Sequence, residues 1–160
     1  MKLLMTAMIA VLMFAGTAAL ADEQTEREVR QSIVDSYAKT NRTKMASSEN
    51  YSMQGAVEFW SSGGVMHDVS RDDNAGEYDE FNIEAFHIRV VTLVPGQAAV
   101  AHFYAQGSMK PKGAPRVGNY FTRATQVFVK EDGEWRIRSS HWSPVLGGAG
   151  TSQTSLQEED

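Results

Sequence analysis

The dipeptide Asp132-Gly133 constrains the fold of this 160-residue chain more than any other feature, because it separates two runs rich in aromatic and β-branched residues. The runs cover residues 119–130 and 134–145. Asp-Gly in such a position is typical of a two-residue β-hairpin turn, in which both turn residues take positive φ. The turn would place Glu131 opposite Glu134 and would thereby set which side chains share a face.

A second turn signal, Pro95-Gly96, predicts another hairpin, formed by strands over 81–94 and 98–107. A longer loop over 110–115 contains two prolines and a glycine and joins the two hairpins. Four consecutive strands connected in this way predict an antiparallel sheet.

Alternation along the strands divides the side chains of each hairpin between two faces. The face of the second hairpin that we expect to pack under a helix comprises Tyr120, Thr122, Ala124, Gln126, Phe128, Trp135, Ile137, Ser139, His141 and Ser143. The apolar face of the first comprises Phe86, Ile88, Val90, Thr92, Ala99, Ala101, Phe103 and Ala105. The opposite face carries His87, Arg89, His102, Tyr104 and Gln106. A slip of one residue would invert each assignment.

Residues 22–41 have a helical period, because Val29, Ile33 and Tyr37 recur every four residues in a polar background. Acidic residues in the first turn suit the positive end of the helix dipole. We therefore expect an N-terminal helix whose apolar stripe covers the sheet.

The stretch between this helix and the first hairpin has weaker signals. Residues 41–54 predict a loop or a short helix, and residues 71–78 predict a charged loop. Residues 56–69 predict one strand with a bend at its glycines. Together the elements predict an α+β fold in which an N-terminal helix packs on a mostly antiparallel sheet.

Residues 1–21 are expected to be a signal peptide. Lys2 precedes an apolar run over 3–15, and Ala19 and Ala21 fit the small-x-small pattern of a cleavage site. The run is shorter than the roughly 20 residues that a bilayer span needs, and a retained anchor is the alternative. We expect cleavage after Ala21, a periplasmic or secreted protein, and no stable membrane anchor afterwards.

Residues 22–146 are then the folded domain, and residues 147–160, with few large apolar side chains, are expected to be a disordered acidic tail. The chain has no cysteine, which excludes disulfides, thiolate nucleophiles and cysteine-ligated metals. A formal net charge of −5 is unfavourable for binding nucleic acid. The four histidines have no metal-ligand spacing, so we expect neither a metal nor a cofactor.

Three segments carry a family resemblance: residues 132–143, 94–101 and 122–128. They resemble the SnoaL-like branch of the nuclear transport factor 2-like superfamily, over about residues 23–145. The resemblance implies a cone, in which a strongly curved, mostly antiparallel sheet wraps over helices and encloses an internal cavity. Members include ketosteroid isomerases, polyketide cyclases, dehydratases and kinase association domains, so the fold alone does not define the function.

The resemblance also bears on chemistry. Isomerase members use a pocket tyrosine, a carboxylate base and a protonated carboxylic acid, and Tyr37 matches the tyrosine by position. The matching strand positions hold Gln126 and Ser139 instead of acids. Kinase association domains carry a pocket arginine where this chain has Gln126. Both departures argue against carrying those functions over unchanged.

The candidate catalytic residues are therefore His141, as a proton shuttle near neutral pH, and Tyr37. A buried histidine hydrogen-bonded for structural reasons is the alternative for His141. The candidate ligand-binding residues, of which the aromatic ones would equally serve as core, are Gln126, Ser139, Tyr120, Phe103, Phe128 and Trp135.

Three functions remain open at this point. The first is an exported protein that binds a small, largely apolar organic ligand, with no specific activity assigned. The second is an isomerase, cyclase or dehydratase that uses His141. The third is a non-catalytic dimeric interaction domain, because dimers through the outer sheet face are common in the superfamily. An outer face with His102, Tyr104, Thr125 and Trp142 would suit such a homodimer.

Overall fold

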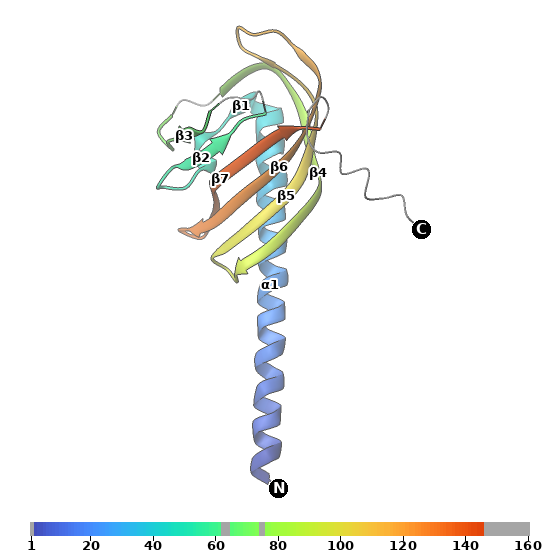
Figure 1. Cartoon of the computed structure of the whole chain (residues 1–160), viewed down its shortest axis with the longest axis vertical. Coiled ribbons are helices and arrows are strands. Elements are labelled where there is room, and N and C mark those ends of the chain that lie inside the picture. Colours follow the sequence, from blue (N-terminus) through green and yellow to red (C-terminus); the bar gives the residue numbers. More distant parts are fainter. Residues whose placement is uncertain (1, 62–64, 74–75, 146–160) are drawn as a thin grey trace, which may run out of the picture.

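A computed structural model describes residues 2–61, 65–73 and 76–145, with side chains described from Leu20 onward. One long helix packs against one face of a curled, mostly antiparallel sheet (Figure 1). The elements are α1 (Lys2–Thr43), β1 (Met45–Ala46), the short 3₁₀ helix η1 (Ser48–Asn50), β2 (Ala56–Phe59), β3 (His67–Val69), β4 (Gly76–Val94), β5 (Ala98–Pro111), β6 (Val117–Glu131) and β7 (Glu134–Pro144). The predicted α+β architecture is confirmed.

The strands are arranged in the order β1-β4-β5-β6-β7-β2-β3. Strands β4 to β7 form the predicted antiparallel meander, and Glu131 pairs with Glu134 across the Asp132-Gly133 turn as expected. β2 adds to the sheet by pairing parallel to β7.

The single bent strand predicted over 56–69 is wrong. The segment forms two short strands, β2 and β3, which pair antiparallel with Ala56 opposite Val69. The chain therefore reverses direction between Phe59 and His67 instead of bending, and only β2 joins the rest of the sheet.

The predicted helical stripe is confirmed, since Val29 and Ile33 are buried and Tyr37 packs against the core. The contact of α1 with the sheet extends back to Thr25, in the first turn of the helix predicted over residues 22–41. There the Gly96 N–H donates to the Thr25 hydroxyl at 2.8 Å. The N-terminal half of α1 extends beyond the sheet (Figure 1). None of the helices in the described part of the chain combines the length and the apolar character that crossing a membrane requires.

Small side chains on the inner face of β5 allow α1 to lie close to the sheet. Ala99, Ala101 and Ala105 are fully buried. Larger residues on the neighbouring strands, among them Ile83, Val90 and Phe128, complete the core around them. Because these residues alternate with exposed ones, the sheet has one apolar face, as the alternation along the predicted strands indicates.

A bulge in β7 changes which of its side chains face the helix. Phe128 pairs with Ile137, but the next pair is Val127 with Ser139, so Arg138 is an extra residue on β7. An extra residue inverts the alternation beyond it. The expected inward placement of Ser139, His141 and Ser143 is therefore wrong, and Ser140 and Trp142 face inward in their place.

A second bulge lies in β4, where Phe86 pairs with Tyr104 but Arg89 pairs with His102. His87, one of the two residues between them, has a φ of 51°. The bulge turns Phe86 to the outer face, where its ring stacks on Tyr104 at a centroid distance of 5.6 Å, so the inward placement expected for Phe86 is wrong.

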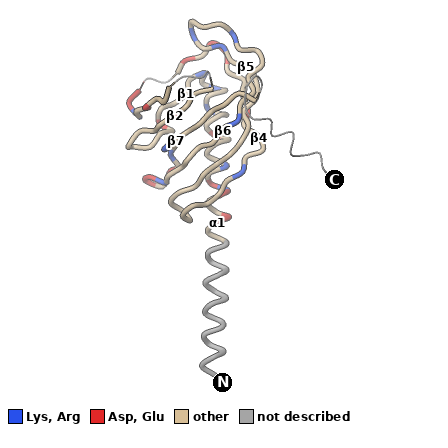
Figure 2. The backbone as a smooth tube through the Cα atoms, in the orientation of Figure 1, with Lys and Arg blue, Asp and Glu red and all other residues tan. Residues whose placement is uncertain are grey.

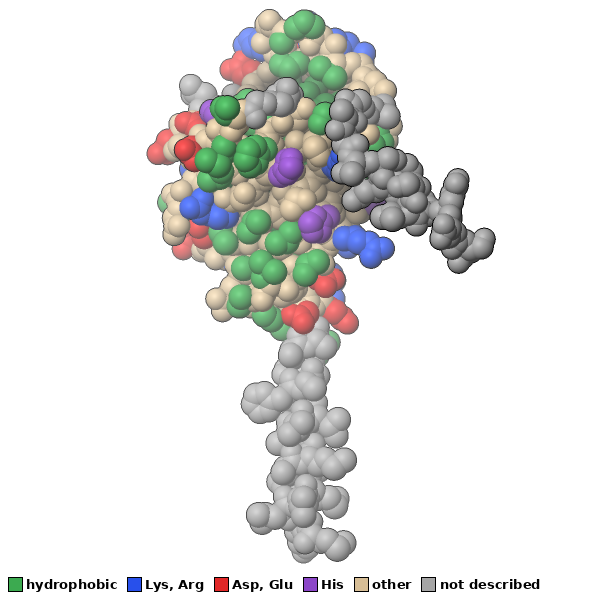
Figure 3. All heavy atoms as spheres, viewed as in Figure 1, with side chains coloured by type: hydrophobic (Ala, Val, Ile, Leu, Met, Phe, Trp, Pro, Cys, Tyr) green, Lys and Arg blue, Asp and Glu red, His purple; other side chains and the backbone are tan. Residues whose placement is uncertain are grey.

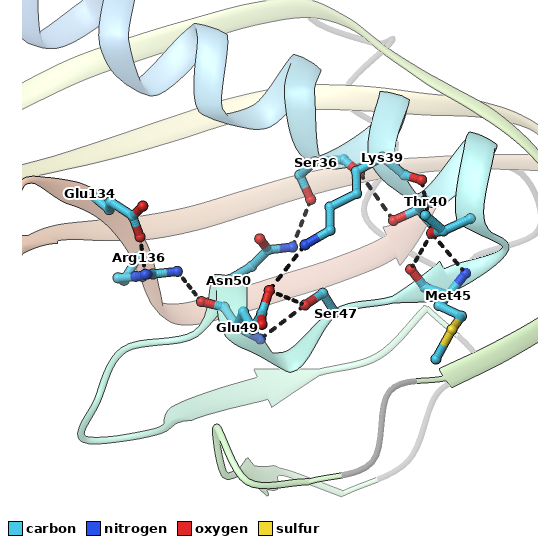
Figure 4. Close-up of polar contacts among 10 residues, drawn as sticks. Ser36, Lys39, Thr40, Met45, Ser47, Glu49, Asn50, Glu134 and Arg136 are labelled. Atoms are coloured by element: carbon cyan, nitrogen blue, oxygen red, sulfur yellow. Dashed lines mark hydrogen bonds and ion pairs between the residues drawn. The ribbon is translucent and has the colours of Figure 1, made fainter.

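The 3₁₀ helix η1 is held between α1 and β7 by polar contacts (Figure 4). Lys39 Nζ lies 3.0 Å from the Glu49 carboxylate, and the Asn50 amide donates to Ser36 Oγ at 2.9 Å. Arg136 donates to the Glu49 backbone carbonyl from the β7 side. These contacts fix the path of the chain from the end of α1 into β2.

Basic and acidic residues are interspersed along the strands (Figure 2). Basic residues at the β5–β6 turn have acidic partners on β4, since Lys110 near the end of β5 lies 2.7 Å from Asp79 and Arg116 in the turn lies 2.7 Å from Glu80. These exposed pairs contribute little stability individually, but they neutralise basic side chains at the turn.

Glu28 on α1 links the helix to the second hairpin. Its carboxylate accepts hydrogen bonds from Lys130 Nζ at 2.6 Å and from the Trp135 indole at 2.9 Å. These bonds, with a third from Gln24, lower the pKa of Glu28 from 4.5 to about 2. The carboxylate therefore stabilises the fold above pH 4.5, and this contribution is lost as the pH falls toward 2.

Glu28→Gln is expected to lower the free energy of unfolding at pH 7 by about 1 kcal/mol, a value discounted for solvent screening. It should also flatten the loss of stability between pH 4.5 and pH 2. Urea unfolding at several pH values measures both effects. Glu23→Gln, which removes an exposed pair with Arg27, is the matched control. An equal effect of the two substitutions would contradict the role of Glu28.

Gly107 on β5 cannot carry a side chain. Its φ is 152°, and a Cβ would lie 1.9 Å from the Asn82 carbonyl oxygen on β4. We expect Gly107→Ala to cost at least about 3 kcal/mol of unfolding free energy, because backbone atoms would have to move. Gly118→Ala, whose Cβ would meet only the flexible end of Arg116, should change it by less than about 0.5 kcal/mol. Similar melting temperatures for the two variants would refute the close approach of β4 and β5.

Candidate functional site

Polar side chains gather on the inner face of the sheet, where α1, β2, β6 and β7 meet. We call them the inner polar cluster, and its members are Tyr37, Tyr51, Glu58, Tyr120, Gln126 and Ser140. Polar groups on the buried face of a sheet require hydrogen-bond partners. Their partners show what the cluster can bind.

Glu58 is the charged centre of the cluster and is only 4% exposed. Parallel pairing of β2 with β7 places it beside Ser140, whose hydroxyl donates to Oε1. The Trp60 indole N–H donates to Oε2 at 2.9 Å. Burial, and then the charge of Glu58 and a hydrogen bond to it, raise the pKa of Tyr51. The carboxylate is thus surrounded by donors.

Tyrosine hydroxyls form a second part of the cluster. Burial raises the pKa of Tyr37 well above its ordinary value, and the nearby Tyr120 adds to the shift. Burial also raises the pKa of Tyr120, whose hydroxyl lies 3.2 Å from Ser61 Oγ. These phenols keep their protons at physiological pH and can donate hydrogen bonds to an acceptor on a ligand.

The side-chain amide of Gln126 has hydrogen-bonding groups that are not used within the protein as described. It lies on β6 opposite Ser140 and is 5% exposed. The hydrogen bonds formed among the described residues leave its side-chain amide without a partner, although no fully buried side-chain polar atom of the described part lacks one. The amide therefore retains accessible surface, and it can both donate and accept.

Aromatic side chains form an apolar wall beside the cluster. The ring of Tyr37 meets Phe103 edge-on at a centroid distance of 6.2 Å and stacks on Phe81 at 6.5 Å. Trp142 also meets Phe103 edge-on, at a centroid distance of 5.7 Å. A carboxylate, phenols and an amide beside such a wall can hold the polar atom of a largely apolar molecule and can exchange a proton with it.

The predicted site residues are divided by the structure. Tyr37, Tyr120 and Gln126 belong to the inner polar cluster, and Phe103 borders it. Ser139 and His141 do not, because the bulge at Arg138 turns them outward. The Ser139 hydroxyl donates to the Val57 carbonyl at 3.1 Å, and the exposed His141 ring lies 5.6 Å from Phe59.

Phe128 and Trp135 lie on the inner face but within the helix–sheet core. The Trp135 indole N–H is already bonded to Glu28. Lys130 Nζ lies 5.4 Å from the centroid of the Trp135 ring. Both aromatic residues therefore have an evident structural role.

Sequence reasoning missed Glu58, Ser140 and Tyr51. Glu58 carried a signal, since it is an acidic residue at an inward position of the short apolar run that begins at Ala56. Ser140 carried none, because its inward placement depends on the bulge.

No group of three or more metal-ligating side chains lies close enough to hold an ion among residues 20–61, 65–73 and 76–145. Two grooves lie elsewhere on the surface. One, of about 520 Å³, is bordered by Asn41, Asn82 and Gln106. The other, of about 1100 Å³, which we call the outer groove, is bordered by outer-face residues such as His102, Thr125 and His141 and extends to Glu26 and Arg30 on α1.

Solved structures with the same fold include proteins of several descriptions. The chain is similar to a nuclear transport factor 2-like protein of unknown function from Pseudomonas putida, with 20% identity over 76% of this chain and 87% of that one and a TM-score of 0.53. It is similar to a candidate scytalone dehydratase from Novosphingobium aromaticivorans, with 11% identity over 76% and 93% and a TM-score of 0.57.

A third similar structure is a candidate dehydratase of the nuclear transport factor 2-like family from Streptomyces avermitilis, with 18% identity over 78% of this chain and 99% of that one and a TM-score of 0.56. Identities this low show that the fold is shared, and they carry no information about whether the activity is shared. No curated protein matches the chain. The family model of the SnoaL-like domain matches residues 28–147. With its helix, curled sheet and matched sequence, the chain belongs to the SnoaL-like domain family.

Proposed function

We propose that this protein binds a small, largely apolar organic molecule against the inner polar cluster. The observation that carries the proposal is the Gln126 amide, which is almost fully buried beside Ser140 without a partner among the described residues. Because the amide keeps a small accessible surface, a ligand carbonyl or hydroxyl can reach it and form the hydrogen bonds that no described residue supplies.

The apolar part of the ligand would lie against Phe81, Phe103 and Trp142. These rings contact one another or Tyr37 at spacings typical of aromatic pairs, and together they form the apolar surface beside the cluster. A flat ring system with one or two polar atoms matches this combination.

A second candidate is an acid–base enzyme of the isomerase, cyclase or dehydratase type. Glu58 favours it, because a buried carboxylate beside phenolic donors can remove a proton from a bound molecule while a tyrosine hydroxyl stabilises the developing charge. The dehydratase descriptions of two similar structures agree with this chemistry. The acid–base role predicted for His141 would require a molecule in the outer groove, because that side chain lies on the other face.

We also propose export. The leader would be cleaved after Ala21 and the protein released to the periplasm or the medium. Two observations support a leader that is separate from the domain. The N-terminal half of α1 extends beyond the sheet, and the family match begins only at residue 28 (Figure 1).

We further propose a homodimer through the outer face of the sheet. Large apolar side chains are exposed there, among them Val91 at 52% and Phe59 at 45%. Tyr104 and Thr125 lie on this face as expected from the sequence, whereas Trp142 lies on the inner face and cannot contribute.

The binding proposal predicts that a naphthol, a flat aromatic ring system with one hydroxyl, raises the melting temperature of the purified protein, since a ligand selective for the native state must do so. Gln126→Leu should weaken its affinity at least tenfold by removing the buried amide. Titration by fluorescence measures the dissociation constant, and mass spectrometry of co-purifying molecules provides further ligands.

Gln97→Leu is the matched control, because Gln97 lies in the exposed β4–β5 turn, away from both faces. The affinity of the Gln97→Leu variant for the naphthol should equal that of the native protein. Equal weakening by both substitutions, or no effect of Gln126→Leu on any molecule that binds, would contradict the site.

A further inference from the structure

Arginine side chains border the outer groove without carboxylate partners. They are Arg89 on β4, Arg123 on β6 and Arg30 on α1, and all three are exposed. None of them forms an ion pair with another described residue, since the ion pairs of the described chain involve other arginines and lysines. Glu26 is the one carboxylate among the described residues that border the groove. The groove therefore has an excess of positive charge.

Charged residues further along the sheet have partners of their own. Glu80 on β4 lies 2.7 Å from Arg116, and Arg136 on β7 pairs with Glu134. Glu84, which also lies on β4, borders the smaller groove and not the outer one. The outer groove is thus left with three guanidinium groups against one carboxylate, and it can attract an anion from outside the protein.

The strand register brings two of these arginines to the same stretch of the groove. Arg89 pairs with His102 on β5, and Arg123 pairs with Tyr104, two residues further along β5 and on the same face. The two arginines therefore stand on either side of β5. Because β1 pairs only with the start of β4, this part of β4 is the edge of the sheet, and the groove extends round it to Arg30.

Polar contacts orient the donors between β5 and β7. Arg123 Nε donates to the Ser143 hydroxyl at 2.9 Å, which positions the guanidinium and leaves its two terminal nitrogens without a bond to a described residue. His102 Nδ1 lies 3.0 Å from Thr125 Oγ1, beside the two arginines. A guanidinium held in this way can form two parallel hydrogen bonds to the oxygens of a carboxylate or a phosphate.

Aromatic rings lie beside these donors. The Tyr104 ring stacks on Phe86 at a centroid distance of 5.6 Å and lies 5.7 Å from the Phe121 ring, which gives a flat organic molecule an apolar surface to pack on. Histidine side chains are visible near the middle of this face in Figure 3, and three of them border the groove. An imidazole has at least one N–H donor whether or not it is charged.

We propose that the outer groove binds a small organic anion, whose carboxylate or phosphate group lies between Arg89 and Arg123 and whose apolar body packs beside Tyr104. A groove of about 1100 Å³ is large enough for such a molecule. The site is separate from the inner polar cluster, where the buried carboxylate of Glu58 would repel an anion.

The inference depends neither on the ligand proposed for the inner polar cluster nor on the proposed homodimer. Each copy of the chain has a complete groove of its own. Because the groove continues round β4 to Arg30 on α1, it extends beyond the face of the sheet that a homodimer would cover.

Fluorescence titration of the purified protein at pH 7 with three naphthalene compounds tests the proposal. A naphthoate and a naphthyl phosphate carry the two anionic groups, and the naphthol is their neutral analogue. We expect at least one anion to bind, and the tighter one identifies the group that the groove prefers. Raising the NaCl concentration from about 0.05 M to about 0.5 M should weaken the anion affinity at least threefold, because salt screens exposed charges.

Variants locate the bound anion. The double variant Arg89→Gln, Arg123→Gln should weaken the affinity for the anion at least tenfold. Arg42→Gln is the matched control, because it removes an exposed arginine that does not border the groove, and it should change the affinity less than twofold. Gln126→Leu should also leave the anion affinity unchanged. Circular dichroism verifies the fold of each variant.

The remaining outcomes would contradict the proposal or separate it from the inner site. Failure of both anions to bind at about 1 mM overturns it. An anion affinity that the double variant leaves unchanged, or that Arg42→Gln weakens equally, overturns the role of the two groove arginines. Loss of anion binding in Gln126→Leu would place the anion at the inner polar cluster and also overturn it. Failure of the naphthol alone to bind counts against the inner site and leaves the anion site standing.

Discussion

The pairing of β6 with β7 shifts by one residue at Arg138, and the chemistry on each side of the sheet depends on that shift. Before the bulge, Trp135 and Ile137 face the helix, as simple alternation from the turn requires. After it, Ser140 and Trp142 take the inner face and His141 takes the outer one. Without the extra residue a histidine would lie beside Gln126, and Glu58 would lose the donor that Ser140 supplies.

Two surfaces with different chemistry result from one sheet. The inner surface combines a buried carboxylate, phenols and an amide with an aromatic wall, which suits a small molecule with one polar end. The outer surface combines exposed apolar side chains with imidazoles and guanidinium groups, and it is the face through which we propose the homodimer. The short strand β2 contributes to both, because Glu58 faces inward and Phe59 outward.

Local signals predicted much of this fold. The four-residue repeat of Val29, Ile33 and Tyr37 predicted the helix and its buried face, and the Asp132-Gly133 turn predicted the register next to it. The bulges could not be predicted, because Arg138 and His87 are ordinary residues without the glycine that often marks such sites. The parallel pairing of β2 with β7 is a long-range contact, so the partner of Glu58 was not visible in its own segment.

The register beyond Arg138 can be measured directly, because the chain has no cysteine and introduced pairs can cross-link only with each other. The double variant Thr125→Cys, His141→Cys places two thiols opposite each other on the outer face, within the range of a disulfide. Ala124→Cys, His141→Cys places them on opposite faces. Mild oxidation should yield an intramolecular disulfide in the first variant and none in the second, as mass spectrometry of the monomer would show. A disulfide in the second variant alone would mean that the bulge is absent and that His141 faces the helix.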